Sequence, residues 1–269
     1  EKNGETDVLG RLRARIRPFM LRRTKREVVK ELPEKVEQIT RLELTPAHRR
    51  RYDQHLTRER TRVLGMLEDM DRNRVAIFRA LTKLRQLALD PRLVDTDLPP
   101  IPSAKITSLL GQIQELAEEG HRALVFSSFT GFLKLVRGTL EAEGIEYVYL
   151  DGRTRDRPAR IARFREGGAP VFLISLKAGG FGLTLTEADY VFVLDPWWNP
   201  AAENQAVDRA HRIGQTRAVN VYRMVSADTI EEKVVALQQR KRDLFASVVD
   251  TGEFRSAAIT ATDIRGLLE

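Results

Sequence analysis

The sequence predicts an α/β fold with a central, mainly parallel sheet flanked by helices, a helical hairpin inserted before the core, and a long helix after it. Two observations carry this prediction. Beyond residue 101, short apolar runs alternate with helical segments of about 10 to 15 residues, which is the pattern of βαβ units. Before that point, two successive apolar stripes at helical spacing indicate an αα-hairpin.

Changes in composition divide the chain into four parts. Residues 1–35 are a basic segment, and residues 36–100 hold a strand and the helical hairpin. The Pro-rich stretch DTDLPPIP leads into the α/β core of residues 101–226. Residues 227–269 form a C-terminal bracing helix and a small, polar tail, part of which we expect to be disordered.

The N-terminal elements follow from alternation and helix signals. The sequence VEQITRLEL at 36–44 predicts a strand, and Thr45-Pro46 then supplies an N-cap and a first-turn proline. Residues 71–73 are expected to separate the two helices of the hairpin. The predicted core stripes are Tyr52, Leu56, Val63, Leu67 and Met70 on the first helix and Val75, Phe78, Leu81, Leu84 and Leu87 on the second.

The core elements alternate along the rest of the chain. Strands are predicted at 123–126, 145–150, from Val171, from Tyr190 and at 219–224. Helices are predicted at 103–119, 131–143, 156–165, from Pro200, and from a cap at Asp228 to about Val249.

Composition excludes several classes of function. The chain has no cysteine, and its four histidines show no HExxH spacing, so we expect no disulfide, thiolate nucleophile or metal site. No apolar run reaches the length of a membrane span, and the first ten residues lack the features of a signal peptide. We therefore expect a soluble intracellular chain that is not secreted and has no membrane partner.

The formal net charge of +7 is concentrated in the N-terminal part. Residues 1–100 hold 24 Lys and Arg against 16 Asp and Glu, and the segment Arg11 to Arg26 contains eight basic residues and no acid. Such a run favours a polyanionic partner, and a solvated basic helix is the alternative.

A Gly-rich loop, SLKAGGFG, follows the apolar run at 171–174. Its three glycines within four residues allow backbone N–H groups to approach an anion, and Lys177 adds a positive charge. A tight structural turn explains the glycines equally well. The chain contains no G-K-[ST], so this loop is not a P-loop.

Two arginines follow in the predicted helix from Pro200. Gln205, Arg209 and Arg212 are spaced i, i+4 and i+7, which places them on one helical face, and the order strand, loop, strand, helix favours one edge of the sheet. Arg209 has no carboxylate three or four residues away and could stabilise charge on a transferring phosphoryl group. Asp208 lies four residues before Arg212, so a surface helix with an internal salt bridge is the alternative.

Four strings in order resemble the second-lobe motifs of the SWI/SNF family of helicase-like, ATP-dependent DNA translocases. They are LVFSSFT at 124–130, YLDGRT at 149–154, FLISLKAGGFGLTLTEADYVFVLDPWWNP at 172–200 and NQAVDRAHRIGQTR at 204–217. PFMLRRTKREVVKELPEK at 18–35 also resembles the block that joins the two lobes in that family, so the resemblance covers roughly residues 10–240.

The resemblance implies a RecA-like C-terminal motor lobe that acts on double-stranded DNA and on bound proteins. It would close over ATP and Mg²⁺ held mainly by the N-terminal lobe of the same parent chain. The implied roles are arginine fingers at Arg209 and Arg212, nucleotide-cleft positions at Gly180, Gly182, Gln205 and Asp208, DNA-backbone positions at Ser127, Ser128, Arg153 and Lys177, and a Trp-Asn-Pro element at Trp198, which could instead be a buried packing residue.

The sequence departs from the family at two places and lacks half of the expected site. Thr184 stands where the family usually has Asn, and Asp90-Pro91 stands where it usually has His-Pro. Neither a Walker A sequence nor Asp-Glu-x-His is present, so we expect the isolated chain not to hydrolyse ATP. The alternative functions are a non-catalytic DNA- or protein-binding module and a lobe of an RNA-directed helicase. We expect a location in the cytoplasm or nucleoid of a prokaryote, or in the nucleus of a eukaryote.

Overall fold

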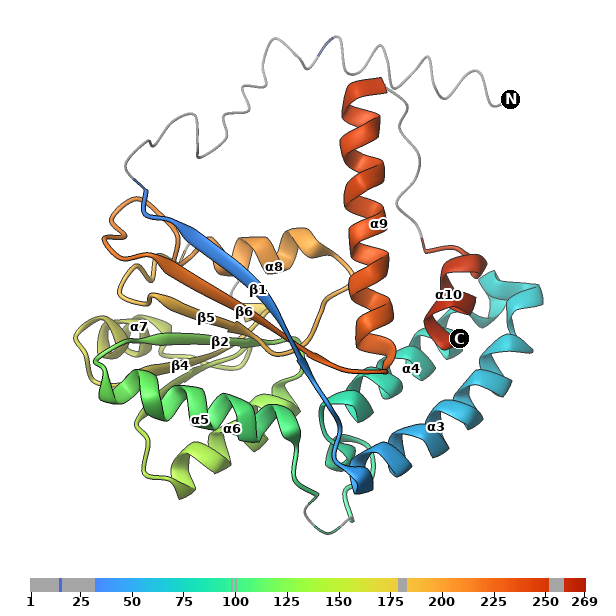
Figure 1. Cartoon of the computed structure of the whole chain (residues 1–269), viewed down its shortest axis with the longest axis horizontal. Helices are drawn as coiled ribbons and strands as arrows, with labels where there is room; N and C mark the ends of the chain where they lie inside the picture. The colour runs from blue at the N-terminus through green and yellow to red at the C-terminus, as the bar shows by residue number, and fades with distance from the viewer. Residues whose placement is uncertain (1–14, 16–31, 98, 100, 179–182, 252–258) are drawn as a thin grey trace.

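The computed structural model describes residues 15, 32–97, 99, 101–178, 183–251 and 259–269, without the side chains of 241–251. Within these residues, a six-stranded sheet has the order β1-β6-β5-β2-β4-β3, and every neighbouring pair is parallel (Figure 1). The predicted α/β class is confirmed. The strands are β1 (Lys35–Leu42), β2 (Ala123–Ser127), β3 (Tyr147–Leu150), β4 (Val171–Ser175), β5 (Tyr190–Val193) and β6 (Val219–Ser226).

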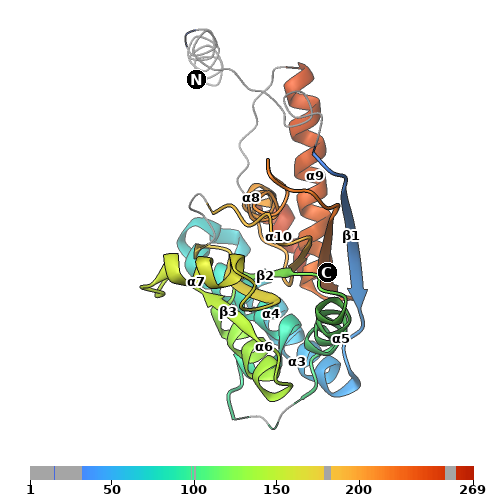
Figure 2. The same ribbon diagram turned by 90° about the vertical axis from the view of Figure 1, so that its left-hand side faces the viewer.

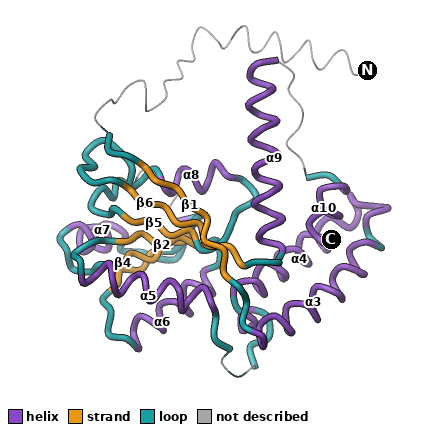
Figure 3. Tube along the Cα trace, viewed as in Figure 1, coloured by secondary structure: helices purple, strands orange, loops and turns teal. Residues whose placement is uncertain are grey.

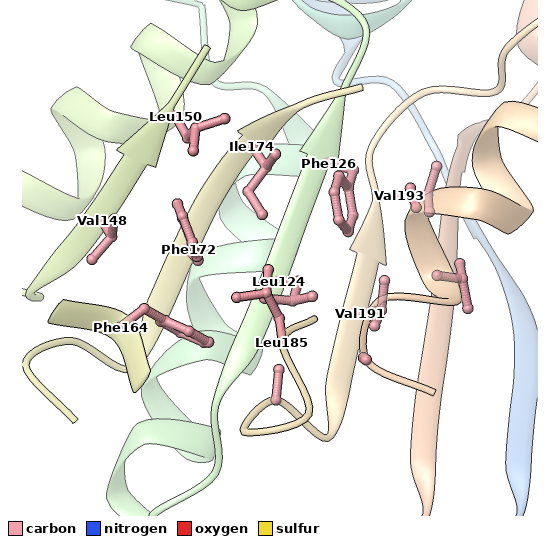
Figure 4. Packing of buried hydrophobic residues seen from close by; sticks show 14 of the residues in the cluster. Leu124, Phe126, Val148, Leu150, Phe164, Phe172, Ile174, Leu185, Val191 and Val193 are labelled. Carbon is pink, nitrogen blue, oxygen red and sulfur yellow. The ribbon is translucent and has the colours of Figure 1, made fainter. Parts of the chain in front are cut away.

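Helices cover both faces of this sheet (Figure 3). Because successive side chains of a strand point to opposite faces, β2 sends Leu124 and Phe126 to one face and Val125 to the other. The first face packs against α7 and α8, where Phe164 contributes to the core shown in Figure 4, and the second packs against α5 and α6. These helices are α5 (Ala104–Glu118), α6 (Thr130–Ala142), α7 (Arg157–Arg165) and α8 (Pro200–Val207).

Strand β1 joins the sheet of the core although it precedes the hairpin in the chain. It pairs with β6 over its full length, from Lys35 opposite Val219 to Leu42 opposite Ser226. The strand predicted at 36–44 is therefore present, and the sheet draws on the segment 36–100 as well as on 101–226. β1 lies at the edge of the sheet, and its Val36 and Ile39 are about half exposed.

The helical hairpin consists of α3 (Pro46–Leu64) and α4 (Met70–Leu89). Its break lies at residues 65–69 and not at the predicted 71–73, because the Asp69 side chain accepts a hydrogen bond from Arg72 N and caps α4. Val75 is 65% exposed, so its predicted place in the core stripe is wrong. Leu81, Leu84 and Leu87 are buried as predicted, whereas Phe78 is only partly buried.

Two C-terminal helices complete a separate apolar cluster with the hairpin. α9 (Ile230–Thr251) begins after Thr229, whose hydroxyl accepts a hydrogen bond from Glu231 N, so Thr229 rather than Asp228 provides the cap. α9 extends beyond the sheet in both views (Figures 1 and 2). α10 (Ala261–Leu268) starts with a capping box and buries Ile264 against the hairpin cluster, so this part of the tail is ordered.

Apart from residue 15, the basic run at 11–26 lies outside the described residues. Among the helices that the structure describes, none combines the length and the hydropathy needed to cross a membrane.

Candidate functional site

The candidate residues lie at two opposite edges of the sheet. Ser128, Arg153 and Lys177 follow strands β2, β3 and β4, at the edge where the parallel strands end. Arg209 lies at the opposite edge, where the strands begin. Its carbonyl accepts a hydrogen bond from the backbone N–H of Leu185, in the loop that leads into β5. The prediction that the Gly-rich loop and the arginines lie along one edge of the sheet is wrong, because α8 leads from the end of β5 back to the start of β6.

Arg209 is buried and lacks an ionic partner. The residue is only 4% exposed, its Nε has no hydrogen-bond partner, and no ion pair involving it occurs within the part of the chain that the structure describes. Burial lowers the pKa of Arg209, and the nearby charge of Arg212 lowers it further. A buried guanidinium beside a second cation is costly unless it meets an anion. The geometry therefore favours a negatively charged ligand here.

The helix that was predicted to carry both arginines ends before them. α8 ends at Val207, and Arg209 N then donates to Ala206 O at 3.2 Å in a tight turn. Gln205 is exposed on α8, Arg209 is buried, and Arg212 is exposed. The prediction that these three residues share one helical face is wrong. Asp208 occupies the C-cap position between Gln205 and Arg209.

The Gln215 carboxamide fixes the turn that follows. Its Nε2 donates to Ala188 O at 2.8 Å and to Ala210 O at 3.1 Å, and its Oε1 accepts from Thr216 N and Arg217 N. Gly214 before it has φ +102°, a conformation that favours glycine. No role was assigned to Gln215 from the sequence. The glycine directly before it was the signal that a specific turn occurs here. This residue holds the segment 208–217 against the loop before β5.

The two departures from the family pattern have partners in the structure. The Thr184 hydroxyl accepts a hydrogen bond from Arg212 Nη1 at 3.2 Å. Asp90 is fully buried and accepts from Arg92 Nε at 2.9 Å and from Arg92 Nη2 at 2.6 Å. Thr184 therefore contacts a candidate site residue, whereas Asp90 stabilises the end of the hairpin.

Two basic side chains are exposed where the strands end. Arg153 and Lys177 are both exposed. The loop of Arg153 is fixed by Asp151, whose carboxylate accepts from Arg153 N at 2.8 Å and from the Thr154 hydroxyl at 3.3 Å. Lys177 follows β4, next to β3 in the sheet. The two cations thus lie on neighbouring loops, and Gly180 and Gly182 of the second loop lie outside the described residues.

The last residue of β2, Ser127, and the residue after it, Ser128, are bound to one buried carboxylate. Ser127 is fully buried, and its hydroxyl donates to Asp195 Oδ1 at 2.5 Å. Ser128 N donates to the same oxygen at 3.0 Å, and the Ser128 hydroxyl bonds to Asp195 Oδ2. A DNA contact through the Ser127 hydroxyl does not fit this burial. Ser128 is partly exposed and remains at the surface.

The sequence and the sheet place the chain in the class of helicase-like C-terminal lobes. Residues 104–214 match the helicase conserved C-terminal domain, and residues 2–93 match the SNF2-related domain. The chain belongs to the SWI/SNF family and has the RecA-like fold of its C-terminal lobes.

Relatives from distant organisms support this assignment. An ATP-dependent helicase of Mycoplasma pneumoniae is 39% identical over 91% of this chain and 24% of its own length. A chromatin structure-remodeling complex subunit of Schizosaccharomyces pombe, snf21, is 34% identical over 92% of this chain and 22% of its own length. The chain thus spans about a quarter of the length of the curated relatives it matches.

Solved structures show the same fold. The SWI2/SNF2 ATPase C-terminal domain of Sulfolobus solfataricus has a TM-score of 0.65 at 26% identity, covering 87% of this chain and 98% of that domain. The ATPase core of the same organism in complex with dsDNA has a TM-score of 0.69 at 30% identity, over 96% of this chain and 55% of that core.

Proposed function

We propose that this chain is the C-terminal motor lobe of a SWI/SNF-type ATP-dependent translocase or remodeller of double-stranded DNA. The observation that carries the proposal is the pair Arg209 and Arg212, which places one buried and one exposed guanidinium together at the edge where β5 and β6 begin. The relatives named ATP-dependent helicase and remodelling subunit and the DNA complex of a solved neighbour support it.

The arginines would act on ATP bound between this lobe and the N-terminal lobe of the same parent chain. Preorganised cations stabilise the charge that develops on a transferring phosphoryl group, and they act most strongly where water is excluded. The burial of Arg209 provides that environment. Gln205 and Asp208 would lie in the same cleft, together with Gly180 and Gly182.

The remaining parts of the nucleotide site would come from the other lobe. This sequence has no G-K-[ST] and no Asp-Glu-x-His. The described residues also contain no group of three or more His, Asp or Glu side chains that could hold a metal ion. Mg²⁺ would therefore enter the site with ATP and the N-terminal lobe, where it would neutralise phosphate charge.

The DNA side would be the edge where the strands end. Arg153 and Lys177 would contact phosphates, and Ser128, whose O–H and N–H both donate to Asp195, would face the DNA from the neighbouring loop. Backbone contacts of this kind carry no sequence information and permit sliding along a duplex. The protein would act where DNA is kept, in the nucleoid of a prokaryote or the nucleus of a eukaryote, on DNA that carries another bound protein.

Steady-state ATPase assays of Arg209→Ala in the full-length protein test this function. We expect kcat with duplex DNA to fall by about 10³-fold while the Kd for DNA changes by less than about threefold. The variant lacks the cation that would stabilise charge on the transferring phosphoryl group, and Arg209 would not contact DNA. Arg217→Ala is the matched control, since Arg217 lies eight residues further along and is paired with Asp189 at 3.2 Å. Retained turnover in Arg209→Ala would contradict the proposed role.

The nucleic-acid dependence of the wild-type protein separates the alternatives. Stimulation of the ATPase by duplex DNA supports the proposed function. Stimulation by single-stranded RNA alone would indicate an RNA-directed helicase. DNA binding without any ATPase activity of the full-length protein would indicate a non-catalytic binding module.

A further inference from the structure

Arg85, on helix α4 of the hairpin, is inserted into the edge of the sheet. The residue is 1% exposed. Its Nη2 donates to Asp195 Oδ2 at 3.0 Å and to Pro196 O at 2.7 Å. Three aromatic rings surround the guanidinium at 5.0 to 5.3 Å from its centre, and they belong to Phe129, Trp197 and Trp198. We call this arrangement, together with the Asp195 carboxylate, the Arg85 cage.

The Arg85 cage contacts the loop that is proposed to reach DNA. Arg85 Nη2 lies 3.3 Å from the Ser128 hydroxyl oxygen. Asp195 accepts from the Ser128 backbone N–H and from the hydroxyls of Ser127, at the end of β2, and Ser128, which follows it. The carboxylate that holds this loop therefore also accepts a hydrogen bond from Arg85 of the hairpin.

The same cage is connected to helix α8. Trp197 N donates to Glu203 Oε1 at 2.6 Å, and Glu203 lies in the first turn of α8. Gln238 of α9 donates to the same Glu203 oxygen at 2.7 Å, and Arg223 of β6 donates to Glu203 Oε2 at 3.3 Å. The start of α8 is thus held from three sides. Its other end leads directly into the turn that carries Arg209.

These contacts form a continuous path between the two edges of the sheet. The path runs from Ser128 through Asp195 and Arg85 to Trp197, then through Glu203 and along α8 to Arg209. A short helix is rigid along its axis, so a shift at its first turn moves the residues after its last turn. The hairpin, through Arg85, holds the middle of this path.

We propose that Arg85 is a positioning residue that couples the DNA-facing loop after β2 to the arginine pair at the opposite edge. The inference rests on the proposed function, because it assigns Arg85 to the communication between DNA binding and ATP hydrolysis. It gives the helical hairpin a role that its sequence does not indicate: α4 supplies the side chain that fixes the distance between the loop and α8.

The guanidinium is needed for its shape as well as its charge. Its planar group stacks between rings and donates to several acceptors at once, which the compact ammonium of a lysine cannot do. Arg85→Lys therefore keeps a buried positive charge beside Asp195 but loses the stacked, multiply bonded geometry. Asp195→Asn disturbs the same contact from the other side with almost no change in volume.

A second buried ion pair provides the matched control. Lys105 Nζ lies 2.5 Å from Glu231 Oε2 and also donates to Leu194 O and Met224 O. This pair is as buried as the Arg85–Asp195 pair, and it lies beside the end of β5. Its hydrogen bonds reach neither Ser128 nor Glu203, and its charge acts on Asp195 and Arg85 only through space. Lys105→Met should therefore reduce stability without interrupting the path.

The test measures the stimulation of the ATPase by saturating duplex DNA in the full-length protein. For Arg85→Lys and Asp195→Asn we expect stimulation at saturating DNA to fall by about tenfold, while turnover without DNA changes by less than about threefold. Lys105→Met should keep its stimulation. A thermal unfolding curve is measured for each variant, to verify that the assay temperature lies below its unfolding transition.

The outcomes separate the inference from the proposed function. If wild type is not stimulated by DNA, the proposed function fails and the inference fails with it. If wild type and Arg85→Lys are stimulated equally, only the inference is overturned. Equal loss of stimulation in Lys105→Met would show that Arg85 acts through general stability, and this result would also overturn it.

Discussion

The Arg212 guanidinium donates from Nη1 to the Thr184 hydroxyl at 3.2 Å and so joins the turn after α8 to the loop before β5. Arg212 is exposed, so its side chain would otherwise be free to rotate. We infer that Thr184 limits the orientations of the second arginine of the proposed pair. The backbone of Thr184 is fixed as well, because its carbonyl accepts from Arg165 Nη2 at 2.6 Å.

Thr184→Val should lower the DNA-stimulated kcat by about three- to tenfold, because it removes the acceptor and leaves a side chain of nearly the same volume. Thr184→Asn should retain most of the activity, since the amide oxygen can accept from Arg212. The measurement is the steady-state ATPase of the full-length variants. A Thr184→Val variant as active as wild type would show that Arg212 is oriented by other groups.

Replacing Arg153 or Lys177 by alanine should weaken DNA binding equally for different sequences. Each change removes about one phosphate contact, so the slope of log K against log salt should decrease by about 1. Titrations at several salt concentrations measure both quantities. Arg163→Ala is the control, because Arg163 on α7 already pairs with Glu146. An unchanged slope in Arg153→Ala and Lys177→Ala would place the DNA elsewhere.

The buried His48 should make stability depend on pH. Its Nε2 hydrogen-bonds to Leu87 O at 2.6 Å, its Nδ1 has no partner, and burial lowers the pKa of His48 below the ordinary value of 6.5. Below pH 6.5 the unfolded chain therefore binds more protons at this residue than the folded chain. The contribution of neutral His48 to the free energy of unfolding is fully present above pH 6.5. It is lost as the pH falls from 6.5 toward the pKa of His48 in the folded chain.

Chemical unfolding of wild type and His48→Gln at pH 7.5 and pH 5.5 tests this dependence. The free energy of unfolding should fall less between the two pH values in His48→Gln than in wild type, because all other titrating groups are shared. Equal losses in the two proteins would show that His48 does not contribute.

The isolated 269-residue chain should show no DNA-stimulated ATP hydrolysis. It lacks the sequences that would cradle phosphate and orient water, and two arginines alone cannot bind ATP productively. Phosphate release from the purified chain with saturating duplex DNA measures this directly. Robust turnover would mean that the nucleotide site is complete without a second lobe.

Sequence reasoning predicted most of the fold because the relevant signals are local. Buried strands such as β2 and β4 are short continuous apolar runs, and helix starts such as Pro46 and Pro200 have recognisable residues. The predictions failed where one particular side-chain hydrogen bond, whether local or distant in sequence, decides the outcome. The cap by Asp69 moved the hairpin break, and the turn fixed by Gln215 lies beyond the true end of α8.

The sequence by itself determined the alternation of strands and helices, the family, and the residue types available to bind phosphate. Only the tertiary structure decided where those residues lie. It placed Arg209 and Ser128 at opposite edges, buried the Ser127 hydroxyl against Asp195, and brought Arg85 into the path between them. The physical reason is that periodicity reports which face of an element is buried, whereas the pairing of buried polar groups depends on side chains that meet only after the chain has folded.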